Sequence, residues 1–161
     1  MFNRVLINII NVLRKTMGNT NRLNSSLKFK FATEDHEFRQ IHDLNYKTFV
    51  DEIPQHCQNP LGLLVDKFHD QNTYIICLRG EKLGGMVAVR DLRPFSLDEK
   101  LVDLDSYLPP NVKSVCEVRL LSIDFHFRSG QVFKGLLTAL ADYCIDKGYD
   151  TVIISGTIKE Q

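Results

Sequence analysis

The sequence predicts an α/β fold, in the broad sense that includes α+β proteins, with one mixed, mostly antiparallel sheet flanked by helices. Residues 73–89 contain two apolar runs joined by Arg79-Gly80-Glu81-Lys82, a pattern typical of a β-hairpin. Residues 114–155 read as a strand, a turn, an amphipathic helix and a second strand, an order that makes the two strands parallel. The length of 161 residues suits a single domain.

The folded domain is expected to cover residues 27–161. Alternating polar and apolar residues over 28–33 predict its first strand, and Thr33 is the expected N-cap of the helix that follows. Helically spaced apolar residues carry that helix towards Pro54, which ends it or the loop after it. We also expect a short helix over 61–68. Residues 91–110 hold three prolines and are expected to form a loop with one helical turn.

The strand–helix–strand unit is the most informative stretch. Its first strand is expected over Ser114–Ile123, its turn over 127–131, and its helix up to Gly148, which suits the C′ position. Thr151–Ser155 then forms a second buried strand. The first amides of a helix are unpaired and its dipole favours negative charge, so this turn predicts an anion site that suits a phosphorylated ligand.

The N-terminal residues 1–26 are expected to form an amphipathic helix and a linker. Over 1–17 the polar and basic residues fall on one helical face and most apolar residues on the other. Asparagines interrupt the apolar run, which therefore predicts neither a transmembrane span nor a signal peptide. Such a helix either contacts a membrane interface as a peripheral anchor or packs on its own domain or a second subunit.

The charge pattern excludes some partners. The chain has 20 basic and 20 acidic residues, but residues 1–30 hold six basic residues and no acid. The rest of the chain therefore holds 14 basic against 20 acidic residues, a net charge of −6, which argues against nucleic-acid binding. The four cysteines form no CxxC pair, and no His or Cys grouping has metal-ligand spacing. We expect reduced thiols, no metal and a cytoplasmic protein, at most peripheral to the inner membrane face.

Two stretches resemble the GCN5-related N-acetyltransferase (GNAT) superfamily, in the branch of N-acyl amino acid synthases and acyl-homoserine-lactone synthases. Leu44-Asn-Tyr-Lys-Thr-Phe-Val-Asp-Glu is similar to that branch's pattern of aromatic residues followed by acids, and Cys116-Glu-Val-Arg-Leu-Leu-Ser-Ile is similar to its central strand. The resemblance covers about residues 28–155. It implies an N-acyltransferase with an acyl-CoA or acyl-carrier-protein thioester as donor and a small amine, such as an amino acid, as acceptor.

The candidate site residues follow from this chemistry. Glu117 on the central strand is the candidate base for the amine proton, the alternative being an ion pair with Arg119. The resemblance implies that strand amides around Val118, Arg119 and Leu120 pair with the donor's pantetheine arm. The turn residues expected to hold its phosphate are Arg128, Ser129, Gly130 and Gln131. Asp51 and Glu52 are candidates for binding the acceptor's ammonium, the alternative being a solvated loop.

The chain also departs from the superfamily pattern. Gln131 and Phe133 stand where turn glycines are expected, which favours long or carrier-borne acyl groups over acetyl. The superfamily fold continues with a further helix and strands that this sequence is expected to lack, so a fragment or a partner-completed domain is expected. A non-catalytic acyl-thioester-binding or interaction module therefore stays open as the alternative to an enzyme.

Overall fold

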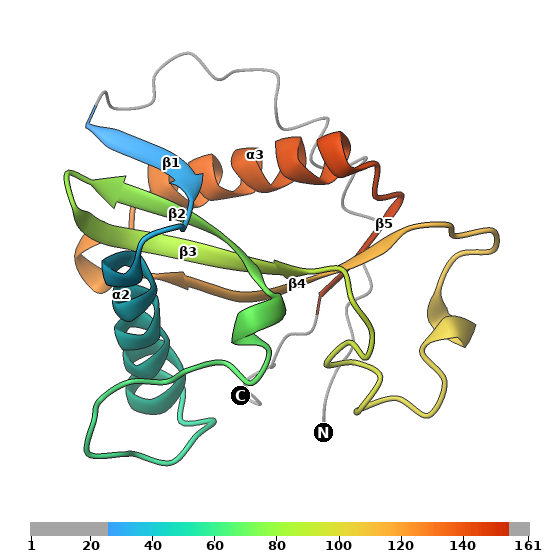
Figure 1. Ribbon diagram of the computed structural model, residues 1–161, viewed down its shortest axis with the longest axis horizontal. Helices are drawn as coiled ribbons and strands as arrows, with labels where there is room; N and C mark the ends of the chain where they lie inside the picture. The colour runs from blue at the N-terminus through green and yellow to red at the C-terminus, as the bar shows by residue number, and fades with distance from the viewer. Residues whose placement is uncertain (1–25, 155–161) are drawn as a thin grey trace.

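The computed structural model describes residues 26–154 (Figure 1). The predicted N-terminal helix over 1–17 and the linker up to residue 25 lie outside the described residues, as does Ser155. In chain order the principal elements are β1 (Leu27–Phe31), α2 (Asp35–Tyr46), the π-helical turn η1 (Lys47–Glu52), β2 (Thr73–Arg79), β3 (Lys82–Arg90), β4 (Val115–Ile123), α3 (Gly130–Lys147) and β5 (Thr151–Ile154).

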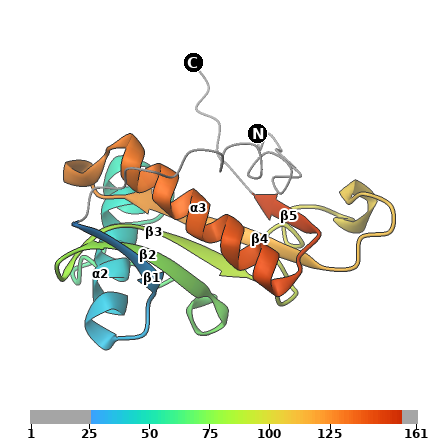
Figure 2. The same cartoon turned by 90° about the horizontal axis from the view of Figure 1, so that it is seen from above.

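The strands form one five-stranded sheet in the order β1-β2-β3-β4-β5. The first four strands pair antiparallel and β5 pairs parallel to β4, as the sequence predicts. The two long helices cover opposite faces: α3 lies along one face and α2 packs against the other (Figures 1 and 2). The predicted mixed, mostly antiparallel sheet flanked by helices is therefore confirmed.

The face under α3 holds the larger apolar core. Residues at every second position of β2, β3 and β4, such as Val87 and Val118, pack against the buried stripe of α3. That stripe consists of Val132, Leu136, Leu140 and Cys144. Gly148 ends α3 with a φ of +72°, a left-handed conformation that glycine adopts without strain and that confirms the predicted C′ glycine.

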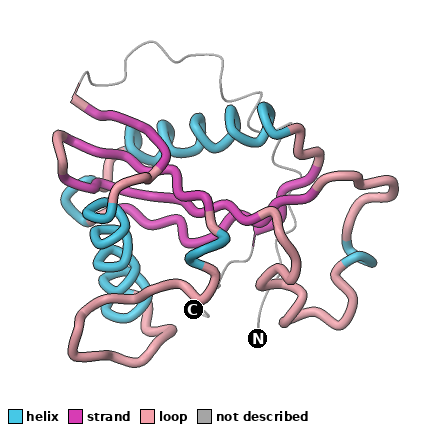
Figure 3. Tube along the Cα trace, viewed as in Figure 1, coloured by secondary structure: helices cyan, strands magenta, loops and turns pink. Residues whose placement is uncertain are grey.

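The opposite face is divided between α2 and loops. Ile41 and Leu44 of α2 pack on the alternate residues of β2 and β3, which are Tyr74, Ile76, Leu78, Leu83, Met86 and Ala88. Residues 91–114 form a long loop broken by one short 3₁₀ turn (Figure 3). Phe95, Leu97 and Leu104 of this loop pack against Ile153 of β5, so the loop covers the part of the sheet that α2 leaves open.

Two local predictions are wrong. The N-cap of α2 is Glu34 and not Thr33, because the side chains of Glu34 and Glu37 form a reciprocal capping box. Residues 61–68 form turns and no helix. The carboxylate of Asp66 accepts the Phe68 N–H at 3.1 Å, a local hydrogen bond that competes with the helical pattern.

The four cysteines are unpaired in the structure. Cys77, Cys116 and Cys144 are buried free thiols, and Cys57 is exposed. Burial raises the pKa of the Cys77 thiol to about 11, which keeps it protonated at neutral pH. Within residues 26–154, no helix is both long enough and apolar enough to cross a bilayer.

Candidate active site

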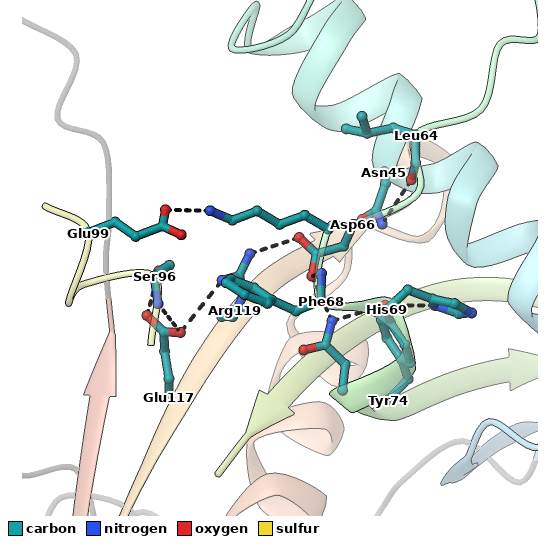
Figure 4. A network of polar contacts seen from close by, with 12 residues as sticks. Asn45, Leu64, Asp66, Phe68, His69, Tyr74, Ser96, Glu99, Glu117 and Arg119 are labelled. Carbon is teal, nitrogen blue, oxygen red and sulfur yellow. Dashed lines mark hydrogen bonds and ion pairs between the residues drawn. The ribbon is translucent and has the colours of Figure 1, made fainter. Parts of the chain in front are cut away.

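A cluster of buried charged side chains lies on the α2 side of the sheet, where β3 and β4 extend beyond the part that α2 covers. It consists of Asp66, Arg90, Glu117 and Arg119, and it is called the charged cluster below. Arg90 ends β3 directly opposite Glu117 of β4. Glu117 and Arg119 are two residues apart on β4 and therefore project from the same face, as the sequence predicts. Figure 4 shows Glu117 and Arg119 of β4 between Asp66 on one side and Ser96 on the other.

Glu117 is completely buried and is held by Ser96. One carboxylate oxygen accepts the Ser96 backbone N–H at 2.9 Å, and the other accepts the Ser96 hydroxyl. The Arg119 guanidinium lies 3.6 Å from the carboxylate, an ion pair longer than a hydrogen bond. The predicted alternative for Glu117, a pair with Arg119, is thus present in the structure. A buried carboxylate beside a guanidinium can also accept a proton from a ligand amine.

Asp66 joins the cluster to a second chain of polar contacts. It accepts a hydrogen bond from the Arg119 guanidinium at 2.8 Å and another from the Asn72 amide at 2.8 Å. The Tyr74 hydroxyl lies 3.1 Å from the Asn72 amide and 3.1 Å from the His69 ring. Burial raises the pKa of Tyr74 to about 12, which keeps the phenol protonated.

Arg90 is the most deeply buried cation of the cluster, with 2% of its surface exposed. One guanidinium nitrogen donates to the Gln71 side chain at 2.6 Å. Its guanidinium carbon lies 3.5 Å from the centroid of the Phe68 ring, and that of Arg119 lies 4.7 Å from the same ring. The pKa of Arg90 is lowered from its ordinary value mainly by burial, and the positive charge of Arg119 nearby is the second cause.

Just beyond the cluster, β4 has a bulge. Met86 of β3 pairs with Ser122, and Ala88 pairs with Arg119. Leu120 and Leu121 of β4 therefore lie opposite the single residue Val87 of β3. Leu120 has a φ of +52°, a rare left-handed conformation for a branched residue. A bulge of this kind leaves a ladder position unpaired, which turns backbone groups towards a ligand or solvent.

The edge of β4 is also open beside the bulge. β5 pairs only with positions 115–118 of β4, and within the described part of the chain no strand covers positions 119–123 on that side. An uncovered strand edge presents backbone N–H and C=O groups that can pair with an extended ligand. This edge leads through the 3₁₀ turn Phe125–Phe127 directly to the start of α3.

At the start of α3 the sequence-predicted phosphate residues lie in one turn. Ser129 occupies the N-cap position without a side-chain capping hydrogen bond, and Gly130 has open space where a Cβ would stand. Arg128 forms an ion pair with Glu52 of η1, a residue distant in the sequence. Its Nε–H also donates a hydrogen bond to the Ile123 carbonyl at 3.3 Å. The contact unites two residues that the sequence assigned to different ligands, one to the donor phosphate and one to the acceptor.

The structure therefore places the predicted residues in two groups. Glu117 and Arg119 lie in the charged cluster, whereas Glu52 and Arg128 pair at the start of α3, with Asp51 exposed nearby in η1. Sequence reasoning missed Arg90, Asp66 and Ser96. The sequence gives a weak indication of Arg90, because this residue extends the alternating pattern of β3 by one position on the face of Ala88. Asp66 and Ser96 lie in irregular segments, where no sequence pattern indicates their position.

One hollow in the surface lies away from the charged cluster. It has a volume of about 450 Å³ and is lined by Arg93, Asp105, Leu108–Lys113 and Val115, at the far end of the 91–114 loop. No member of the charged cluster lines it, so the hollow does not mark the chemistry described above. Among residues 26–154 there is no group of three or more His, Cys, Asp or Glu side chains placed to hold a metal ion.

The sequence matches no protein-family model, and no curated protein sequence matches it. Solved structures do match. An aminoglycoside acetyltransferase from an uncultured soil metagenomic sample, solved with trehalose, has a TM-score of 0.56 and 19% identity over 86% of this chain and 82% of its own.

Two synthases are also similar in structure. The CoA-dependent acyl-homoserine lactone synthase BjaI, solved with SAM and isopentyl-CoA, has a TM-score of 0.61 and 20% identity over 77% of this chain and 63% of its own. FeeM, an N-acyl amino acid synthase from uncultured soil microbes, has a TM-score of 0.60 and 14% identity over 80% of this chain and 70% of its own. At these identities the likeness concerns the fold.

Proposed function

We propose that this chain, which has the fold of the GCN5-related N-acetyltransferases, is an N-acyltransferase that moves an acyl group from a thioester to an amine. The main support is the organisation of β4. Its positions 115–118 carry a buried carboxylate, its next positions form a bulge with an open edge, and its end leads into the start of α3. One strand would thus carry the proposed base, the proposed backbone surface and the proposed anion site in sequence.

The reaction needs few groups. The neutral amine attacks the thioester carbonyl carbon and forms the C–N bond, and the C–S bond then breaks to release a thiolate. Glu117 accepts the proton that the amine loses, directly or through water, and the thiolate takes up a proton on release. In this proposal a backbone N–H at the Leu120 bulge stabilises the oxyanion of the tetrahedral intermediate.

The donor would lie along β4. Its pantetheine arm pairs with the open edge at positions 119–123, and its phosphate lies at the amides of Ser129, Gly130 and Gln131. Arg128 would exchange Glu52 for the phosphate, an exchange with a low cost because the ion pair is largely exposed. Coenzyme A and a carrier protein present the same arm, and either thioester fits this path.

A long acyl chain is the preferred donor in this proposal. Three large apolar side chains near the donor path are exposed: Leu121 at 38%, Phe125 at 71% and Phe133 at 45%. They come from β4, from the turn after it and from the first turn of α3. Burying such side chains against a long acyl chain would be favourable, whereas an acetyl group is too small to cover them.

Calorimetry with CoA, acetyl-CoA and palmitoyl-CoA tests the donor. We expect the affinity to rise with acyl length, and equal or reversed affinities would contradict the long-chain preference. The rate of turnover is then measured from the release of free thiol. Glu117→Gln should reduce turnover by about 100-fold or more while leaving donor affinity within about threefold. If the variant turns over as fast as the wild type, Glu117 is not the base; if the wild type binds thioesters but never turns over, the binding-module alternative holds.

Peripheral membrane contact through residues 1–17 also remains a prediction, drawn from the sequence alone. Vesicles with anionic lipid should retain the protein more than neutral vesicles, and salt should weaken the retention. A chain that lacks residues 1–17 serves as the control. Retention that does not depend on those residues would refute the anchor.

A further inference from the structure

Two histidines face each other between α2 and the irregular segment that leads into β2. His42 lies on α2, His69 begins the 3₁₀ turn η2 (His69–Gln71), and the centroids of their rings are 4.6 Å apart. The Phe38 ring, also on α2, packs against His69 in a T-shaped contact. Both histidines are only partly exposed, so a positive charge on either ring would be poorly hydrated.

The hydrogen bonds around His69 are those of a neutral ring. The Asp66 carboxylate only accepts, so the Asn72 atom at 2.8 Å from it is the amide nitrogen, and this nitrogen also donates to the Tyr74 oxygen at 3.1 Å. The Tyr74 hydroxyl in turn donates to Nδ1 of His69, 3.1 Å away, which assigns the ring proton of His69 to Nε2. Protonation of Nδ1 would deprive Tyr74 of this acceptor.

The surroundings of His42 also favour a neutral ring. Its Nδ1 is buried and has no hydrogen-bond partner among residues 26–154. A charged imidazole carries an N–H at both nitrogens, so a charged His42 would bury a donor without an acceptor. Burial first, and the charge of His69 second, lower the pKa of His42 from its ordinary value.

We propose that the histidine pair, His42 and His69, holds residues 64–72 against α2 only while both rings are neutral, and that protonation releases this segment. Two positive rings at this separation repel each other, and each has an N–H that its surroundings do not satisfy. Leu64 supplies two further contacts with α2: its N–H donates to the His42 carbonyl at 3.0 Å, and its carbonyl accepts from the Asn45 amide at 3.4 Å. An irregular segment held in this way can open locally while the sheet stays folded.

Release of residues 64–72 would uncover the charged cluster. The segment carries Asp66, which accepts a hydrogen bond from Arg119 at 2.8 Å. It also carries Phe68, whose ring lies over the guanidinium groups of Arg90 and Arg119. In Figure 4, Asp66 and Phe68 lie between Arg119 and the contact of His69 with Tyr74. The charge of the two histidines would therefore control the access of water to the charged cluster.

The other charged groups around the pair do not neutralise it. Among residues 26–154 no carboxylate forms an ion pair with either ring: Asp43 pairs with Lys47, and Asp66 pairs with Arg119. Asp70 is exposed, so water screens its charge. The titratable and charged side chains around the two rings are Arg39 and Asp43 of α2, Asp66, Lys67 and Asp70 of the segment, Tyr74 of β2 and Arg119 of β4.

The lowered pKa of His42 gives the sign of the pH effect. With the segment closed, His42 binds a proton less readily than in an open chain, where its pKa has the ordinary value of 6.5. The closed segment is therefore favoured fully above pH 6.5 and loses stability as the pH falls below this value.

Hydrogen exchange of the full chain, combined with NMR of its ¹³C-labelled histidine rings, tests the pair. From about pH 7.5 to about pH 5, the amides of residues 64–72 should lose protection by roughly tenfold or more, after correction for the intrinsic exchange rate at each pH. The amides of α3 should stay protected. The loss should have the same midpoint as the ring titration of His42, which should lie below pH 6.5.

Three results would overturn the proposal. Residues 64–72 stay protected although the His42 ring has titrated, or their opening and the titration of His42 have different midpoints. In the third, the amides of α3 lose protection in parallel, which indicates that acid unfolds the whole domain and not this segment.

Variants of single histidines separate the pair from other acid effects. His42→Gln should make the protection of residues 64–72 independent of pH, whereas His36→Gln, at an exposed position on the same helix, should keep the wild-type pH dependence. Because His42→Gln can itself loosen the segment, His69→Gln provides a second test. It removes one of the two charges, so the titration of His42 and the opening should move together to higher pH. A titration of His42 that does not move would contradict the pairing.

The histidine pair needs neither a thioester nor an amine, so it is independent of the proposed acyltransferase function. A chain that opens at low pH but never releases thiol keeps the histidine pair and refutes the acyltransferase. A chain that acylates amines while residues 64–72 stay closed at every pH keeps the acyltransferase and refutes the pair.

Discussion

The two faces of β3 and β4 differ sharply, although the same strands build both. Towards α3 the strands present Val87, Val89, Cys116 and Val118 to a closed apolar core. Towards the loops they present Arg90, Glu117 and Arg119, whose guanidinium groups include donors without a hydrogen-bond partner among the described residues. Strand alternation lets one sequence specify a stable core on one side and a polar site on the other. Stability and ligand chemistry should therefore respond to different substitutions.

Among substitutions on the polar face, removal of the Asp66 side chain should reduce the free energy of unfolding most. Asp66→Ala leaves the Arg119 guanidinium buried without its 2.8 Å partner and should cost about 3–5 kcal/mol of unfolding free energy. Asp70→Ala, at an exposed position four residues away, is the control. Denaturant unfolding measures both. A loss below about 1 kcal/mol in Asp66→Ala would show that the charged cluster is already open to water.

On the α3 side, Leu136→Ala should cost about 2–5 kcal/mol, because it removes a fully buried side chain from the middle of the core. Leu61→Ala, whose side chain is 82% exposed, should cost little. Acyl-CoA binding by the folded fraction should be unchanged in Leu136→Ala. If the folded fraction of this variant instead bound acyl-CoA more weakly, the two faces would not be independent.

The start of α2 gives a prediction for the pH dependence. Burial raises the pKa of Glu37, but hydrogen bonds from Lys30, Thr33 and Glu34 outweigh it and lower the pKa from 4.5 to about 2. The stabilisation is complete above pH 4.5 and is lost as the pH falls to about 2, an effect of up to about 3 kcal/mol.

The stability difference between wild type and Glu37→Gln should therefore shrink over this pH interval, as followed by denaturant unfolding at each pH. Asp35→Asn, which alters an exposed acid in the same helical turn, is the control. A stability difference that stays constant from pH 5 to pH 2 would contradict the hydrogen-bonded carboxylate.

The smallest stability effect is expected at the exposed Glu52–Arg128 pair, whose loss should cost less than about 1 kcal/mol. Its effect on the donor should be larger and of opposite sign for the two residues. Arg128→Gln should weaken CoA binding by roughly tenfold, and Glu52→Gln should strengthen it, because it frees the guanidinium. Calorimetry measures the affinity of both variants for CoA. Weaker binding in both variants would contradict the assignment of Arg128 to the phosphate site.

Much of the fold could be predicted because its signals are local. The alternation of the strands, the apolar stripe of α3 and Gly148 at its end each depend on residues close together in the sequence. The false helix at 61–68 shows the limit: its apolar residues suggested a helix, but Asp66 bonds to the Phe68 amide and fixes a turn.

The site was harder to predict than the fold. The shared face of Glu117 and Arg119 follows from strand alternation, and β4 is where the sequence placed it. Arg90 was missed because a charged residue at the end of an apolar strand is normally exposed. Asp66, Phe68 and Ser96 were missed because only the packing of two irregular segments brings them onto β4.

The most direct test of the account is one reaction. The full chain is incubated with an acyl-CoA that it binds and a mixture of the twenty proteinogenic L-amino acids, and the products are measured by mass spectrometry. We predict an N-acyl amino acid and free CoA in equal amounts, with about 100-fold less of both from Glu117→Gln. If the acyl-CoA binds and no amide forms, β4 belongs to a binding site and not to a catalytic one.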